Sequence, residues 1–259
     1  MLTAKNITYK VDGKTLLNNV SVSFLPGKMN LVIGPNGSGK STLIKILSGL
    51  LKNYSGEVIY TNVNLHSVKN SALAKIRAVL SQNVEVTFPL KVSDVVMMGR
   101  YPHFTNAPSP IDFEACNKAL ELFGIADMAN RDFMTLSGGE KQRVHFARVL
   151  AQIWYGEGKS FRYLLLDEPL TFLDIHYQLD FIEKINQFLK QEHVIVVLVV
   201  HDLNLALRHA DNITLLNNGS ILAHGSKTEV LTPENIKTAF RINVEILQDE
   251  IRQSRYILF

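Results

Sequence analysis

The stretch that most constrains this chain is LVIGPNGSGKST, which occupies residues 31–42. Three apolar residues run into a glycine-rich turn that ends in Lys-Ser-Thr, and apolar residues then recur at helical spacing over 43–47. This order predicts a strand, a loop and a helix. The pattern G-x-x-x-x-G-K-[ST] suits phosphate binding, because its glycines let successive backbone N–H groups face an anion at the positive end of the following helix. A glycine turn without a ligand is the alternative.

We call residues 34–42 the phosphate loop. Lys40 is expected to reach the β- and γ-phosphates of a nucleotide, and the Ser41 hydroxyl is expected to occupy one Mg²⁺ position. The predicted phosphate-binding residues are Gly34, Pro35, Asn36, Gly37, Ser38, Gly39, Lys40, Ser41 and Thr42.

Composition narrows the class of protein. With 259 residues and 46% apolar content, the chain can bury a sizeable core without metal or disulfides. Cys116 is the only cysteine, which excludes disulfide frameworks, indicates a reducing compartment and suggests a packing role within its helix. The net charge of +3, without a long basic block, does not favour nucleic-acid binding.

Membrane insertion is not predicted either. No apolar stretch approaches the ~20 residues that span a bilayer, and the first residues lack the apolar region of a signal peptide. We therefore expect any work at a membrane to proceed through a partner.

Two segments, one before and one after the phosphate loop in the sequence, contain further candidate ligand-binding residues. Residues 2–25 alternate apolar and polar side chains around the turn Val11–Lys14, which predicts a β-hairpin. Tyr9 lies in its first strand and could stack on a purine, although a strand tyrosine more often packs. Gln82 ends a short apolar strand, at the edge where open α/β sheets bind ligands. Position alone leaves both roles open.

From about residue 83 to 153 the pattern is helical without intervening strands, with helices predicted over 92–98, 111–123 and 137–152. This indicates a helical insertion into an α/β core. The third helix follows LSGGE, residues 136–140, which we call the signature. Its serine and two glycines at a helix start form a second candidate anion site, and a simple helix cap is the alternative.

Acidic and histidine side chains follow two apolar strands. Asp167 and Glu168 end the strand predicted over 161–166; because adjacent carboxylates repel, their pairing implies a cation or chemistry. His201 follows the strand over 194–200, at a ligand edge, although a structural histidine is the alternative. The remaining histidines show no metal spacing and are expected on the surface: His66, His103, His145, His176, His193, His209 and His224.

Taken in order, the phosphate loop, Gln82, the signature, Asp167-Glu168, Asp174 and His201 resemble the ATP-binding subunits of ABC transporters over nearly the whole chain. The signature is the most specific mark. The resemblance implies an α/β fold: a P-loop NTPase (RecA-like) core with an N-terminal antiparallel β subdomain and an inserted helical subdomain. The implied ranges within this single ATP-binding domain are about 1–82 and 160–225 for the core and β subdomain, 83–155 for the helical subdomain, and 226–259 for a tail.

The same resemblance implies the roles of the site residues. Tyr9 would stack on the adenine of ATP, Ser41, Gln82 and Asp167 would surround Mg²⁺, Glu168 would polarise the attacking water, and His201 would contact the γ-phosphate. In that family two subunits face head to tail as a homodimer. The ATP held by one phosphate loop would then meet the signature residues of the other chain, which are Ser137, Gly138, Gly139 and Glu140.

A closer resemblance is to the importer branch that handles iron chelates, cobalamin and haem. It is carried by residues 96–103 and 201–211, and residues 77–82 and 147–154 resemble the ATPases of haemin importers. This implies ATP hydrolysis that powers haem uptake at the cytoplasmic face of the bacterial inner membrane. Two copies of a permease and a periplasmic or surface substrate-binding protein would complete the system, without nucleic acid.

Three alternatives remain: the same role for a ferric siderophore or cobalamin, a soluble ABC-type ATPase acting on nucleic acid or the ribosome, and a regulatory nucleotide-binding module. One departure from the family is Phe172, where a small residue is usual. At a segment expected to cross the dimer interface, its ring could fill a gap or alter coupling.

Overall fold

The computed structural model describes residues 1–81, 86–156, 160–171, 173–191, 193–249 and 254–259, so the candidates Gln82 and Phe172 lie outside the described residues. The chain divides into two compact units, which we describe one at a time. Unit 1 contains residues 1–68, 166–168 and 195–259. Unit 2 contains residues 69–165 and 169–194.

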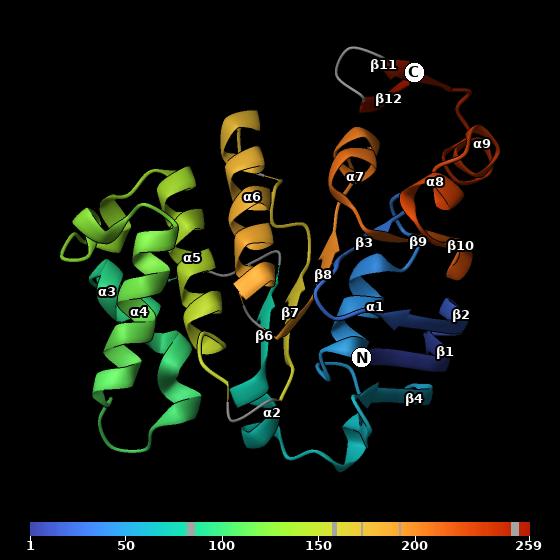
Figure 1. Ribbon diagram of the computed structural model, residues 1–259. Coiled ribbons are helices and arrows are strands. Elements are labelled where there is room, and N and C mark those ends of the chain that lie inside the picture. Colours follow the sequence, from blue (N-terminus) through green and yellow to red (C-terminus); the bar gives the residue numbers. More distant parts are fainter. Residues whose placement is uncertain (82–85, 157–159, 172, 192, 250–253) are drawn as a thin grey trace. The chain divides into compact units, whose positions relative to one another are not determined.

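An antiparallel sheet opens unit 1 (Figure 1). Its strand order is β2 (Lys14–Phe24), β1 (Leu2–Val11), β4 (Ser55–Tyr60) and β5 (Val63–Asn64). Asp12 and Gly13 join β1 to β2 with φ of 47° and 77°, as a two-residue hairpin turn with left-handed residues requires. The predicted N-terminal hairpin is confirmed.

The second sheet of unit 1 carries the phosphate loop. It runs in the order β10 (Ser220–Gly225), β9 (Asn212–Asn217), β3 (Met29–Ile33) and β8 (Val194–Val199), with β3 parallel to both of its neighbours. All five residues of β3 are buried, which explains why its sequence is uniformly apolar apart from Asn30. The amide of Asn30 donates to three backbone carbonyls. Helix α1 (Lys40–Leu47) follows the phosphate loop. The α/β class is confirmed.

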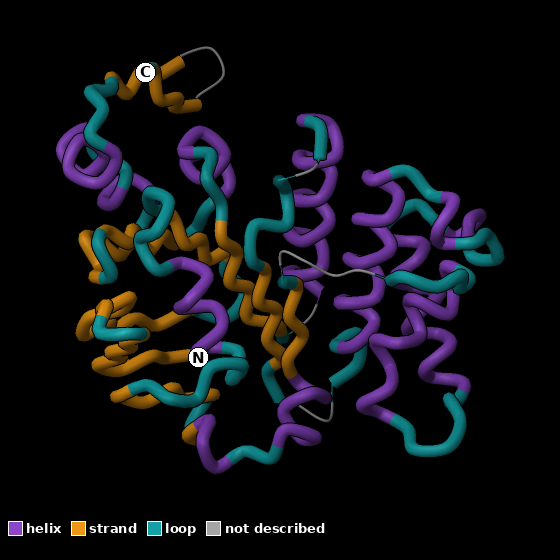
Figure 2. The backbone as a smooth tube through the Cα atoms, turned by 180° about the vertical axis from the view of Figure 1, so that it is seen from behind, coloured by secondary structure: helices purple, strands orange, loops and turns teal. Residues whose placement is uncertain are grey.

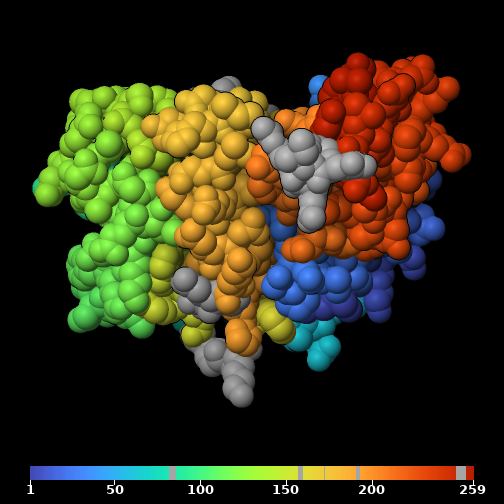
Figure 3. All heavy atoms as spheres, turned by 45° about the horizontal axis from the view of Figure 1, so that its top comes forward, coloured from blue at the N-terminus to red at the C-terminus, as the bar shows by residue number. Residues whose placement is uncertain are grey.

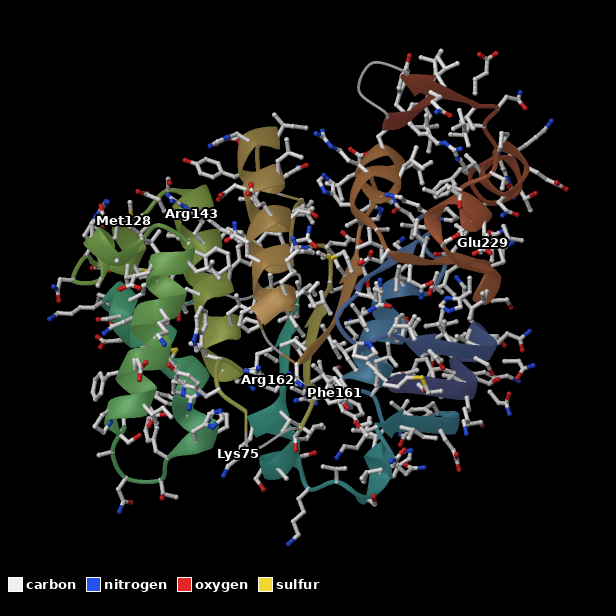
Figure 4. The ribbon with its side chains drawn as sticks, viewed as in Figure 1. Lys75, Met128, Arg143, Phe161, Arg162 and Glu229 are labelled. Atoms are coloured by element: carbon white, nitrogen blue, oxygen red, sulfur yellow. The ribbon has the colours of Figure 1, made fainter. Side chains whose placement is uncertain are left out.

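The C-terminal part of unit 1 contains α7 (Leu203–His209), α8 (Lys227–Val230), α9 (Pro233–Phe240) and the hairpin of β11 (Glu245–Asp249) and β12 (Ser254–Leu258). Thr232 caps α9 by accepting a hydrogen bond from the backbone N–H of Asn235 at 3.2 Å. Helix α8 begins with a capping box between Ser226 and Glu229, which Figure 4 labels. Figure 3 shows the red C-terminal residues lying against the orange surface of the residues before them.

Unit 2 is mainly helical between residues 86 and 156 (Figure 2). It contains α2 (Asn70–Ile76), α3 (Val92–Met97), η2 (Met98–His103), α4 (Pro110–Leu122), α5 (Gly138–Gln152) and α6 (Ile175–Gln191). Strands β6 (Arg77–Leu80) and β7 (Arg162–Leu166) are neighbours in a sheet. Two one-turn helices occupy Ala126–Met128 and Phe133–Thr135. The helices predicted over 92–98, 111–123 and 137–152 are confirmed.

Aromatic packing and one buried ion pair hold unit 2 together. The ring of Phe146 on α5 lies 4.1 Å from that of Phe181 on α6, centroid to centroid. Arg100 and Asp112 form an ion pair of 2.9 Å between side chains that are only 3% exposed. Arg143, labelled on α5 in Figure 4, lies over the ring of Tyr177. Cys116 is buried, and its pKa is raised to about 12 by burial, which agrees with the packing role predicted for it.

Candidate functional site

The phosphate loop has the backbone shape that its glycines were expected to allow. Gly34, Gly37 and Gly39 have φ of 149°, 76° and 102°, values that side chains other than glycine rarely adopt. A Cβ at Gly34 would also lie 2.2 Å from the carbonyl oxygen of Leu216. The loop therefore requires glycine for both backbone conformation and space.

Lys40 is held inside this loop. It is 4% exposed, and its Nζ donates to the carbonyl oxygens of Gly34 at 2.9 Å and Pro35 at 3.0 Å. Burial lowers its pKa, whereas the nearby charges of Glu168 and Asp167 act in the opposite direction. A buried ammonium whose partners are mainly carbonyls is available to an anionic ligand.

Ser41 and Asp167 come together although 126 positions separate them, and the Ser41 hydroxyl donates to Asp167 Oδ1 at 3.0 Å. Asp167 is 4% exposed. Burial raises its pKa and the negative charge of Glu168 adds to that effect, while the bond from Ser41 lowers it. A hydroxyl oxygen next to a buried carboxylate is a suitable pair of ligands for Mg²⁺, because this ion prefers oxygen ligands and its charge would stabilise the carboxylate.

Glu168 and His201 form what we call the acid–histidine pair. His201 Nε2 lies 2.6 Å from Glu168 Oε1, and the side chains are 43% and 14% exposed. Glu168 has a φ of 51°, an uncommon conformation for a residue other than glycine that strains the backbone. Asp167 and Glu168 are thus adjacent in sequence but have different partners, Ser41 and His201.

The other predicted phosphate-loop residues vary in exposure. Asn36 and Gly37 are exposed, Pro35, Gly39 and Thr42 are half-buried, and Ser38 is buried. Ser38 Oγ has no hydrogen-bond partner among the described residues, which fits a ligand that accepts or donates there. Tyr9 lies half-buried on β1 opposite Leu17, in the same unit.

The signature, Leu136–Glu140, belongs to unit 2. Ser137 and Glu140 form a capping box: the Ser137 N–H and hydroxyl both donate to Glu140 Oε2 at 2.7 Å, and Glu140 N donates back to Ser137 Oγ at 3.3 Å. Arg131 pairs with Glu140 at 3.5 Å. Space remains beside both glycines, because a Cβ at Gly138 or Gly139 would meet nothing within 4 Å.

One expectation about the histidines is wrong. His145 is not on the surface: it is 6% exposed, packs edge-on against Phe133, and has its pKa lowered to about 4 by burial, helped by Arg148. Its neighbours Val144 and Phe146 are apolar and also buried, and this flanking pattern is the signal that could have predicted its burial.

Neither a cluster of metal-ligating side chains nor a membrane-spanning helix occurs among the residues that the structure describes. No group of three or more His, Cys, Asp or Glu side chains is arranged to hold a metal ion among them. Within the same ranges, none of the helices has both the length and the apolar character needed to span a bilayer.

Comparison with known sequences decides the family. The sequence profile described as "ABC transporter" matches residues 17–171. The chain belongs to the ABC transporter family. It is 37% identical to the hemin import ATP-binding protein HmuV of Escherichia coli O157:H7 over 261 residues, which cover 100% of this chain and 99% of that protein.

Solved structures of this family share the fold. One is described as a metal-chelate type ABC transporter in an inward-facing conformation; it is 26% identical, has a TM-score of 0.82, and aligns over 100% of this chain and 95% of that one. Another is the dimeric structure of a bacterial ABC transporter cassette, 26% identical with a TM-score of 0.73, covering 88% of this chain and 99% of that one. This ABC-family chain is therefore an ATPase with the fold of the family's ATP-binding cassettes.

Proposed function

We propose that this ABC-family chain is the ATP-hydrolysing subunit of an importer, and that the imported compound is haem. The observation that carries the proposal is the acid–histidine pair beside the phosphate loop of unit 1. Glu168 contacts His201, and these two side chains provide groups for a water and a γ-phosphate. The neighbouring acid Asp167 is bonded to Ser41, and these two provide oxygen ligands for a cation.

In this proposal each side chain acts on the reacting groups by position and charge. Glu168 accepts hydrogen bonds from the attacking water, and His201 donates to an oxygen of the γ-phosphate. Lys40 exchanges its two carbonyl partners for phosphate oxygens. The Ser38 hydroxyl, which lacks a hydrogen-bond partner in the described part of the chain, bonds to the same ligand. Tyr9 packs against adenine.

Mg²⁺ would be held by Ser41, Asp167 and Gln82. When bound, this ion neutralises negative charge that develops on the phosphates. The Ser41–Asp167 contact supports the assignment, because both are oxygen ligands and the buried carboxylate has a raised pKa that a cation would reverse.

The signature has its role, in this proposal, across a homodimer. Ser137, Gly138, Gly139 and Glu140 of one subunit face the ATP held by the phosphate loop of the other. The open space beside the two glycines supports an incoming ligand there, and the dimeric cassette found among the solved structures supports the arrangement. Glu140 orients Ser137 through the capping box.

We place the dimer on two copies of a membrane permease at the cytoplasmic face of the inner membrane, with a separate substrate-binding protein. The domain division proposed from the sequence applies here, with core and β subdomain at about 1–82 and 160–225, helical subdomain at about 83–155, and tail at about 226–259. Co-purification with a polytopic membrane protein is expected; association with ribosomes instead would favour a soluble ATPase.

Haem is favoured as cargo by the relative named for hemin import, whereas the structure described as metal-chelate type is compatible with a ferric siderophore as well. A deletion strain tests this. Growth on haem as sole iron source should be lost and restored by the wild-type gene but not by Lys40→Ala. If growth on haem is normal but growth on a ferric siderophore is lost, the siderophore replaces haem as cargo.

A further inference from the structure

The C-terminal hairpin, β11 and β12, is bonded to α7, the helix that begins two residues after His201. Helix α7 starts at Leu203, and Asp202 caps it by accepting from the N–H groups of Asn204 at 2.7 Å and Leu205 at 3.0 Å. Since only Asp202 separates His201 from α7, the position of this helix determines where the backbone of His201 lies.

Helix α7 needs support from its neighbours. It has seven residues, and helices this short are unstable alone in water. Its stability therefore comes from packing, and it packs against β12, β3 and α8. Its apolar residues Leu203, Leu205, Ala206 and Leu207 are buried.

Asn204 makes the polar connection to β12. Its Nδ2 donates to the carbonyl oxygen of Ile257 at 3.0 Å, and Ile257 N donates to its Oδ1 at 2.6 Å. The amide therefore pairs with Ile257 as another strand would, satisfying one donor and one acceptor of the backbone. The Ile257 side chain is 3% exposed, so the same residue is fixed by packing as well.

We infer that the C-terminal hairpin positions His201 against Glu168, and that Asn204 is the positioning residue that transmits this support through α7. The inference rests on the proposed function, because it assigns the hairpin a task only if the acid–histidine pair takes part in ATP hydrolysis. Within the part of the chain that the structure describes, neither Asn204 nor Ile257 is hydrogen-bonded to the phosphate loop; both act through the placement of the histidine.

The test is Asn204→Asp in the full-length chain. The side chain keeps its shape, but the amide donor becomes an oxygen that faces the Ile257 carbonyl. The matched control is Asn235→Asp in α9, which also lies in the first turn of its helix and also donates to a carbonyl, that of Val230, at 2.9 Å. Steady-state ATP hydrolysis, equilibrium ATP binding and thermal unfolding are measured for each variant.

We expect Asn204→Asp to lower kcat about 5-fold, because the hydrogen bond to the Ile257 carbonyl is replaced by a contact between two oxygens. The Kd for ATP stays within about 2-fold because Lys40 and Ser41 are untouched. Asn235→Asp should leave kcat and Kd within about 2-fold. An unchanged kcat in Asn204→Asp, or an equal rise in Kd, overturns the inference.

A second variant separates the connection from a local effect on α7. Ile257→Pro removes the N–H that Asn204 Oδ1 accepts. If the hairpin acts through Asn204, the double variant will be no slower than the slower single variant; a product of the two separate losses overturns the inference. Absence of ATP hydrolysis in the wild-type protein, by contrast, refutes the proposed function itself.

Discussion

The phosphate loop of unit 1 and the signature of unit 2 contrast in how completely the chain satisfies their polar groups. In unit 1, the Lys40 ammonium and the Asp167 carboxylate are buried, and Ser38 Oγ has no partner among the described residues. In the signature, Ser137 and Glu140 satisfy each other through a capping box. The buried charges and the Ser38 hydroxyl of unit 1 therefore indicate a ligand without reference to another chain.

The difference teaches how each kind of site can be recognised. A site made within one unit is revealed by buried charge and backbone strain. A site completed by another molecule can look like an ordinary helix start, and its glycines are then unexplained by the chain itself. Gly34 is required by its own fold, whereas Gly139 has free space beside it.

The largest effect is expected at Glu168. Glu168→Gln should lower kcat for ATP hydrolysis about 10²- to 10⁴-fold, because the amide does not accept a proton from water, while ATP still binds and the dimer still forms. Hydrolysis assays and equilibrium binding measure this. The matched control is Glu229→Gln, a carboxylate in the same unit that accepts hydrogen bonds from the N–H and hydroxyl of Ser226. Wild-type turnover in Glu168→Gln would contradict the assignment.

A pH-dependent effect is expected in unit 2, which does not contain the phosphate loop. The pKa of His145 is about 4 in the folded protein, compared with 6.5 for an ordinary histidine. Between these two pH values the histidine is protonated in the unfolded chain but neutral in the folded one. Stability is therefore lost as pH falls from 6.5 toward 4, by about 2 kcal/mol between pH 7 and pH 4.5.

Urea unfolding followed by Trp154 fluorescence measures it, because this single tryptophan lies in unit 2 against Phe188. His145→Leu should reduce the loss between these two pH values. An identical pH dependence in wild type and variant would show that His145 is not the group responsible.

A smaller effect is expected from a branched residue in the signature. Gly139→Val should lower hydrolysis at least ~10-fold by blocking the partner-held phosphate, and its melting temperature should change by less than ~2 °C because the space is free. Gly34→Ala is the contrasting variant, since its Cβ would clash with Leu216 and should destabilise unit 1. Normal hydrolysis by Gly139→Val would remove the signature from the proposed site.

The smallest effect concerns the adenine. Tyr9→Ala should raise the Kd for ATP about 5-fold through loss of stacking, with little change in kcat, whereas Tyr9→Phe should bind normally. Binding of ATP and GTP to each variant measures this. Equal affinities in wild type and Tyr9→Ala would favour the simple packing role for this residue.

Local patterns predicted those parts of the fold that local chemistry determines. The apolar run before Gly34 predicted β3, and the helical pattern over 111–123 predicted α4. The contact between Ser41 and Asp167 joins distant positions, so only the family resemblance suggested it. Helix α8 has four residues and no apolar period to detect. The C-terminal hairpin is bonded to Asn204, which is far from it in sequence, so no local pattern indicated this contact.

The left-handed backbone of Glu168 has a consequence for protein engineering. Glycine or asparagine would adopt a φ of 51° more readily, so a library at this position selected only for thermal stability would enrich residues that relieve the strain. Such a selection would discard the acid. Stability screens on this protein therefore need an activity filter at position 168, where the residue with the least backbone strain differs from the acid that the proposed function requires.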